Sequence, residues 1–125
     1  MNEKRILIVD DVNFNIEFET KLIKNLMVGY KINVKIDEAN SVQDALKMID
    51  ENEDYDAMII DMNLPDGSGV DIAKKAREKS DKTRLAALTI YPNEYEAERP
   101  YFDLFLKKPI MMDAFNQNFI RLLQL

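Results

Sequence analysis

Three aspartates follow two short apolar segments of the sequence in the same way. Asp10 and Asp11 come directly after the run Ile6–Val9. Asp61 follows the run Ala57–Ile60 at the same place. If both runs are neighbouring parallel strands, their carboxyl ends meet at one edge of a sheet and the three side chains converge. Two carboxylates about 4 Å apart repel each other by about 4 kcal/mol at an effective dielectric constant of about 20. Such a cluster takes up protons or holds a cation, and an all-oxygen set of this kind suits Mg²⁺.

Two further positions supply groups that would bind a phosphoryl group. Thr89 ends the apolar run Leu85–Leu88 and offers a hydroxyl. Lys107 and Lys108 end the run Leu104–Leu106 and offer ammonium groups. A cation, a lysine and a hydroxyl around a carboxylate form a receptor for a phosphoryl group, which the carboxylate can accept as an aspartyl phosphate. Side chains alternate along a strand, so only one of the two lysines reaches the site, and periodicity leaves open which one.

The composition excludes several other kinds of site. The 125 residues hold 17 Lys+Arg against 23 Asp+Glu, a formal net charge of −6, with no Cys and no His. Direct nucleic-acid binding is not expected, because it needs a basic surface. Disulfides, thiolate metal sites, imidazole ligands and Ser-His triads are excluded. No apolar stretch approaches the ~18 residues that span a bilayer. We therefore expect a cytoplasmic protein without membrane contact.

The elements that must position these groups alternate between strands and helices. Five segments predict strands: the apolar runs Ile6–Val9, Ala57–Ile60, Leu85–Leu88 and Leu104–Leu106, and the segment Val34–Ala39, in which Val34 and Ile36 alternate with Lys35 and Asp37. Helical spacing between them predicts a doubly wound α/β fold, with a parallel sheet covered by helices on both faces. The residues expected on the apolar face of the first helix are Phe14, Phe18, Leu22 and Leu26.

The remaining helices are marked by caps and by apolar spacing. Ser41 to Asp44 form a capping-box pattern, and Ser68 begins a helix that reaches Lys79. The final helix is marked by Phe115, Phe119 and Leu122. Pro92 and Pro100 leave only about two turns for the fourth helix, which should be short or distorted. Five of the eleven Phe and Tyr residues lie between Tyr91 and Phe105, where they would fill the space of a reduced helix.

With these motifs, the sequence resembles the receiver domain of two-component response regulators over nearly its whole length. The matching residues are Asp10, Asp11, Asp61, Leu64, Pro65, Gly69, Thr89, Lys108 and Pro109. The resemblance implies one receiver domain over residues 1–125, with a CheY-like, flavodoxin-like sheet in the order 2-1-3-4-5. Two departures are Ile90, which stands where the family usually has a small residue, and the short spacing of nineteen positions between Thr89 and Lys108.

The resemblance also implies roles for the acidic residues. Asp61 would be the phosphoacceptor. Asp11 would bind Mg²⁺ directly, and Asp10 would bind it through water. Asp61 itself and the backbone carbonyl of Asn63 would complete the protein ligands of the metal.

Three residues would respond to the phosphoryl group in such a domain. The resemblance selects Lys108, which would pair with Asp61 and then with the phosphoryl oxygens. Thr89 would turn inward to hydrogen-bond the group, and Phe105 would swing in with it as the aromatic switch residue. The Lys108–Pro109 bond is a candidate for cis geometry.

The implied partners are proteins. A sensor histidine kinase or a phosphotransfer protein would donate the phosphoryl group, and a downstream effector protein would receive the signal. A homodimer is a further expected assembly. No enzymatic turnover is expected beyond self-phosphorylation and self-dephosphorylation. The sequence leaves open whether the chain acts alone or is part of a longer protein.

Three alternative functions stay open at this point. A receiver-like adaptor would have lost phosphorylation, for which Ile90 and the short fourth segment are the arguments. A phosphatase with an aspartate nucleophile needs a second Asp two residues after Asp61, where Asn63 stands. A flavodoxin-like carrier needs a loop rich in Gly, Ser or Thr after the first strand, where Asp10 and Asp11 would repel a phosphate.

Overall fold

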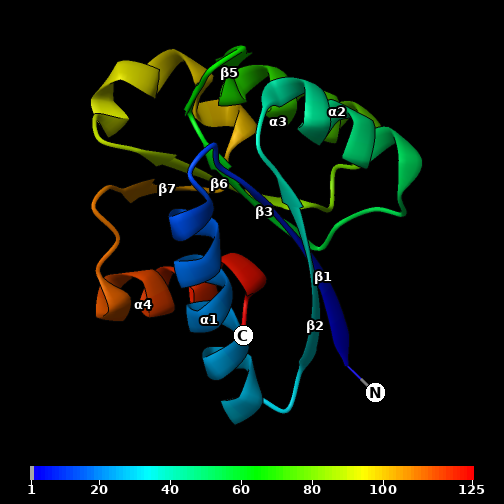
Figure 1. Ribbon diagram of the computed structural model, residues 1–125, viewed down its shortest axis with the longest axis vertical. Coiled ribbons are helices and arrows are strands. Elements are labelled where there is room, and N and C mark those ends of the chain that lie inside the picture. Colours follow the sequence, from blue (N-terminus) through cyan, green and yellow to red (C-terminus); the bar gives the residue numbers. More distant parts are fainter. Residues whose placement is uncertain (1) are drawn as a thin grey trace.

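Five parallel strands form the central sheet of the computed structural model, which describes residues 2–125. The strands are β1 (Glu3–Val9), β2 (Asn33–Ala39), β3 (Ala57–Asp61), β6 (Arg84–Thr89) and β7 (Leu104–Lys107). Their order is β2-β1-β3-β6-β7 (Figure 1). In chain order these strands confirm the predicted arrangement 2-1-3-4-5. The short strands β4 (Asn63–Leu64) and β5 (Gly67–Ser68) pair with each other in a separate hairpin.

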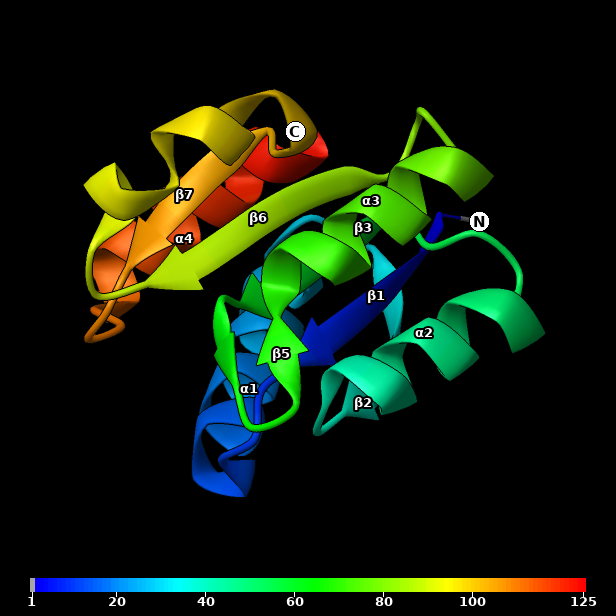
Figure 2. The same cartoon turned by 90° about the horizontal axis from the view of Figure 1, so that it is seen from above.

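Helices cover both faces of this sheet, which is why its inner strands β1, β3 and β6 contain continuous apolar runs, whereas the edge strand β2 alternates. The helices α1 (Asn13–Gly29) and α4 (Met112–Leu123) lie on one face. The helices α2 (Val42–Glu51) and α3 (Gly69–Lys79) lie on the other, as Figures 1 and 2 show. Alternate strand residues enter the two cores: Ile8 and Ile59 pack toward α1 and α4, and Leu7 and Met58 toward α2 and α3.

The N-terminus of α2 is capped from two places. Ser41 Oγ accepts a hydrogen bond from the backbone N–H of Asp44 at 3.1 Å, as the capping pattern predicted. The carboxylate of Asp66, in the turn of the β4–β5 hairpin, accepts from the N–H groups of Val42 and Gln43 at 2.8 and 3.0 Å. These hydrogen bonds hold the pKa of Asp66 below its usual value and tie the hairpin to the helix.

The first helix is present, but its buried face differs from the prediction. Phe14 is 73% exposed, although the spacing of four assigns it to the apolar face. The core-facing side chains are Ile16, Glu19, Leu22, Ile23 and Met27. Phe18 and Leu26 are only partly buried at the margin of the core. The helix is rotated relative to the predicted stripe, so a glutamate points into the core and a phenylalanine points outward.

The helix expected between Pro92 and Pro100 is distorted, as these two prolines predicted. Pro92–Tyr101 forms a 3₁₀ helix, η1, which is interrupted at Tyr95 by non-helical backbone angles (φ −113°, ψ 26°). Tyr95, Tyr101 and Phe105 pack against the core cluster that contains the buried Phe102. These aromatic rings fill the space beside a reduced helix. The Arg77 guanidinium anchors the end of η1, because it donates to the backbone oxygen of Tyr101 at 3.1 Å.

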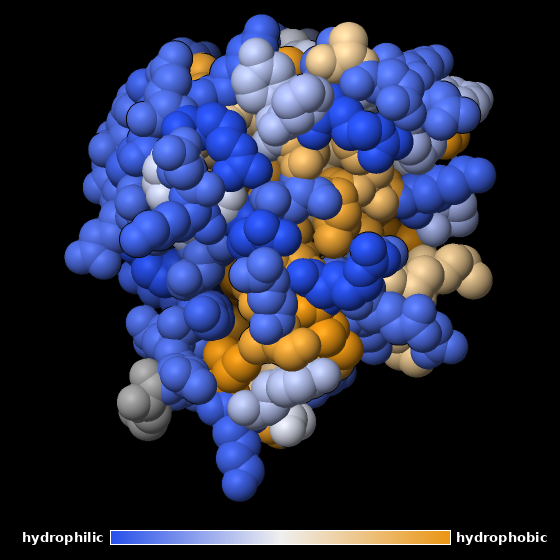
Figure 3. Space-filling view, turned by 180° about the vertical axis from the view of Figure 1, so that it is seen from behind, coloured by the Kyte–Doolittle hydropathy of each residue, from blue (hydrophilic) through white to orange (hydrophobic). Residues whose placement is uncertain are grey.

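The surface of the molecule reflects its high content of charged residues, 32% of the sequence. Seen from behind, hydrophilic side chains surround an apolar area near the middle of the face (Figure 3). Among residues 2–125, no helix combines the length and apolar character needed to cross a bilayer.

Candidate functional site

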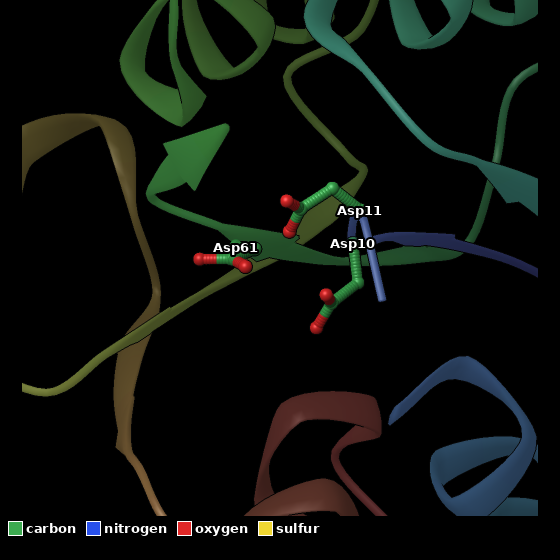
Figure 4. Close-up of side chains that lie close together, drawn as sticks. All are labelled: Asp10, Asp11 and Asp61. Atoms are coloured by element: carbon green, nitrogen blue, oxygen red, sulfur yellow. The ribbon is translucent and has the colours of Figure 1, made fainter. Parts of the chain in front are cut away.

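Strand register brings the three aspartates together at the carboxyl edge of the sheet. Val9 lies opposite Ile60 in the β1–β3 pairing, so Asp10 and Asp61 follow side by side. One carboxylate oxygen from each of Asp10, Asp11 and Asp61 lies within 4.8 Å of the other two. Figure 4 shows these side chains gathered from the ends of two neighbouring strands. Three acidic groups therefore share one small volume.

Asp10 is the most enclosed member of this cluster. It is fully buried, and its carboxylate accepts from the Val12 backbone N–H at 2.9 Å and from the Asn15 amide at 3.3 Å. Burial raises the pKa of Asp10 and the negative charge of Asp61 raises it further, while the Val12 hydrogen bond and the Lys108 charge oppose that shift. A cation at this place would relieve the repulsion, and the donor set offers only the hard oxygen ligands that Mg²⁺ prefers.

Asp61 is held in place by two neighbours, Lys108 and the backbone of Asn63. Its side chain is 3% exposed, and its Oδ2 lies 2.9 Å from the Nζ atom of Lys108. Its Oδ1 accepts from the Asn63 backbone N–H at 3.0 Å. Charge-assisted bonds of this kind orient the carboxylate. Asn63 itself is exposed beside the cluster.

Of the two candidate lysines, Lys108 contacts Asp61 in the structure. In the β6–β7 pairing Thr89 lies opposite Lys107, and the Lys108 backbone N–H donates to the Thr89 backbone oxygen at 3.0 Å. Lys107 is exposed, whereas Lys108 turns to Asp61. The Lys108–Pro109 peptide bond is cis, so that prediction is confirmed.

Thr89 borders the same space without bonding to Asp61. Its Oγ1 accepts from the Tyr91 backbone N–H at 3.2 Å. Together with Asp61 and Lys108 it lines a hollow of about 330 Å³ that opens over the phosphoacceptor candidate. Phe105 lies further away, half-buried between the Phe102 ring at 5.4 Å and the Arg99 guanidinium at 4.9 Å.

Gly69 lets the start of α3 pack directly against the backbone of Asp61. A Cβ atom at Gly69 would lie 2.6 Å from Ile60 Cγ2, 2.8 Å from the Asp61 backbone oxygen and 2.9 Å from Met62 Sδ. All three separations are shorter than a carbon contact allows. Glycine at this position therefore keeps the hairpin and α3 close to the site.

Sequence reasoning missed five residues around this site. The Asn15 amide donates to Asp10, and Tyr91, Glu94 and Tyr95 line the hollow over Asp61. Glu19 is fully buried and its charge interacts with Asp10, Asp61 and Lys108. The sequence contained one signal, because Glu19 lies three residues after Ile16 and four before Ile23, within an apolar stripe. Nothing in the local pattern indicated where Tyr95 and Glu94 would lie.

Comparison with known families gives a match over most of the chain. The family described as response regulator receiver domain matches residues 6–119. The chain belongs to this family. The receiver domain is 28% identical over 116 residues to the hybrid signal transduction histidine kinase L of Dictyostelium discoideum, and 29% identical over 114 residues to the response regulator protein PilR of Pseudomonas aeruginosa. These matches cover 85% and 88% of this chain but only 6% and 24% of the two relatives.

Solved structures agree with the fold of this receiver domain. A CheY-like receiver domain from Methylobacillus flagellatus is 27% identical, with a TM-score of 0.81, and the match covers 97% of this chain and 99% of that one. The response regulator TrrA of Thermotoga maritima, in complex with Mg²⁺ and BeF, is also 27% identical, with a TM-score of 0.74. That match covers 95% of this chain and 98% of that one.

Proposed function

We propose that residues 1–125 act as a single phosphorelay receiver domain in the cytoplasm. Asp61 accepts a phosphoryl group from a histidine kinase or a phosphotransfer protein in a Mg²⁺-dependent reaction. The phosphorylated domain then changes its contacts with a downstream effector protein or with a second copy of the chain. The observation that carries this proposal is the buried Asp61 carboxylate, which is paired with Lys108 at 2.9 Å and lies beside Asp10 and Asp11.

The transfer step follows from the chemistry of a carboxylate nucleophile. One carboxylate oxygen of Asp61 attacks the phosphorus of a phosphohistidine and forms a new P–O bond. The P–N bond breaks, and its electron pair returns to the imidazole nitrogen. The product is an acyl phosphate that carries more negative charge than Asp61 did. Lys108 and the hydroxyl of Thr89 border the hollow in which these oxygens would lie, so both can stabilise that charge.

The acidic cluster fits the magnesium ion that the family resemblance implies. Asp10, Asp11 and Asp61 would hold the ion, with the backbone carbonyl of Asn63. When bound, Mg²⁺ supplies positive charge next to the transferring phosphoryl oxygens. Two observations support this fit: the three carboxylate oxygens lie within 4.8 Å of one another, and burial together with Asp61 raises the pKa of Asp10.

A protein donor is supported by an apolar hollow next to Lys108. This hollow of about 480 Å³ lies between the start of α1 and the segment after β7. Its lining includes Phe14, Phe18, Ile90, Pro109 and Ile110. An apolar surface beside the acceptor suits the packing of another protein while the phosphoryl group is transferred.

Phosphorylation with a small donor tests the proposal directly. Incubation with acetyl phosphate and Mg²⁺ should add the mass of one phosphoryl group, and EDTA should prevent the addition. Intact-mass measurement checks both results. An unchanged mass under both conditions would contradict the proposal and favour the adaptor function. Repeated turnover of a phosphomonoester would instead favour a phosphatase, although Asn63 lacks the acid that such an enzyme needs.

Replacing Ile90 by Ala should speed phosphorylation by acetyl phosphate about two- to fivefold, on the order of 0.5–1 kcal/mol in the barrier. Ile90 is 54% exposed and lines both hollows, so its bulk narrows the approach to Asp61. The rate of mass increase measures the effect. Val28→Ala, an exposed apolar change near the far end of α1, is the control and should leave the rate unchanged. A rate for Ile90→Ala equal to or below that of the natural sequence would show that Ile90 does not restrict access.

A further inference from the structure

Tyr95 lies at the break in the distorted 3₁₀ helix η1. The 3₁₀ segment Pro92–Tyr101 breaks at this residue, where the backbone angles leave the helical region. The half-buried Tyr95 side chain packs against the core cluster that lies under the segment. The same side chain lines the hollow over Asp61, together with Thr89 and Lys108. The residue at the break, Tyr95, therefore contacts both the core and the hollow over Asp61.

The hydroxyl of Tyr95 is available as a hydrogen-bond donor. It makes no hydrogen bond to any group in the part of the chain that the structure describes, residues 2–125. Burial raises the pKa of Tyr95, and the negative charges of Glu94, Asp61 and Glu98 raise it further. The hydroxyl therefore stays protonated at neutral pH and can donate but carries no charge of its own.

A phosphoryl group on Asp61 would add acceptor oxygens to this hollow. Residues with donor groups already border it, namely Lys108, Thr89, Asn63 and Tyr91, and Glu94 adds a negative charge at its wall. The neutral Tyr95 hydroxyl would add a hydrogen-bond donor to this hollow without adding further negative charge. Hydrogen bonds to charged oxygens are about twice as strong as those between neutral groups.

We propose that the Tyr95 hydroxyl binds the phosphoryl group on Asp61 and so couples phosphorylation to the position of Pro92–Tyr101. This inference rests on the proposed function. The segment is anchored at its end by Arg77, which bonds the Tyr101 backbone oxygen, whereas Tyr95 lies at the break. A hydrogen bond from Tyr95 to the phosphoryl group would draw the middle of the segment toward Asp61. The outer surface of the segment, with Glu96 and Arg99 exposed, would move with it.

Beryllofluoride with Mg²⁺ serves as the probe, because it stands in for a phosphoryl group on an aspartate. Calorimetric titration compares the natural sequence with Tyr95→Phe, which keeps the ring and removes only the hydroxyl. The expected result is a weakening of beryllofluoride binding by about five- to tenfold in Tyr95→Phe. Tyr101→Phe is the matched control, since Tyr101 belongs to the same segment but faces Lys74 and not the hollow. Its affinity should stay within about twofold of the natural sequence.

Two further measurements keep the test decisive. Thermal unfolding without beryllofluoride should give the same midpoint for both variants and the natural sequence, which separates loss of the donor from loss of the fold. In protein labelled with 3-fluorotyrosine, the fluorine resonance that is missing from Tyr95→Phe should shift when beryllofluoride is added. Equal affinities for Tyr95→Phe and the natural sequence, or an unshifted resonance, would overturn the role of Tyr95. Failure of the natural sequence itself to bind beryllofluoride and to accept a phosphoryl group would instead overturn the proposed function.

Discussion

Replacing Asp61 by Asn should abolish phosphorylation of this receiver domain. The amide of Asn is a poor nucleophile and has no negative charge, so it neither attacks phosphorus nor pairs with Lys108 as the carboxylate does at 2.9 Å. The natural sequence should take up one phosphoryl group from acetyl phosphate in the presence of Mg²⁺. Asp61→Asn should take up none under the same conditions. Intact-mass measurement over time distinguishes the two results.

Asp81→Asn provides the matched control for this experiment. It is the same chemical change at an exposed residue between α3 and β6, away from the acidic cluster. Its uptake should equal that of the natural sequence. Uptake by Asp61→Asn at the natural rate would mean that another group, such as Asp11, is the acceptor.

Replacing Glu19 by Leu should stabilise the domain by about 3 kcal/mol at pH 7. Glu19 is fully buried in the core beneath α1, and neither of its carboxyl oxygens has a hydrogen-bond partner among the described residues. Burial raises the pKa of Glu19 to about 8, and the charges of Asp10 and Asp61 contribute while Lys108 opposes them. A leucine fills a similar volume without a group that needs water or a partner.

The sign of the pH dependence follows from the two pKa values. In the unfolded chain Glu19 loses its proton near its ordinary pKa of 4.5, but in the folded chain it keeps the proton up to about pH 8. Between these values the unfolded state binds fewer protons, so the stability of the natural sequence falls as pH rises. The advantage of Glu19→Leu should therefore be small at pH 4.5, grow through pH 7 and level off above pH 8.

Urea unfolding at several pH values in EDTA measures this difference. EDTA removes metal ions that would change the charge of the neighbouring aspartates. Glu17→Leu is the control, because Glu17 is exposed on the same helix, and the free energy of unfolding should then follow the pH profile of the natural sequence. Parallel pH profiles for Glu19→Leu and the natural sequence would show that Glu19 is already ionised in the folded domain.

The sequence by itself determined the architecture and the members of the acidic cluster. Short apolar runs that lack alternation are typical of strands covered on both faces, and the regular alternation of strands with helical segments predicted the parallel sheet. Parallel strands end at a common edge, so aspartates after two such runs were expected to meet. Pro92 and Pro100 have no backbone N–H to donate, so the distortion of η1 could be predicted from the sequence.

The tertiary structure alone decided which side chains point inward at the positions that periodicity left ambiguous. Periodicity left Lys107 and Lys108 open, and the family resemblance selected Lys108. In the structure, the pairing of β7 with β6 accompanies the contact of Lys108 with Asp61. Phe14 turns outward and Glu19 inward because the packing of α1 against the sheet fixes its rotation. Tyr95 reaches the hollow through a break in η1. The spacing of residues along the chain predicts which side chains share one face of a helix or strand. Which face points into the core depends on the elements that pack against it in the folded protein.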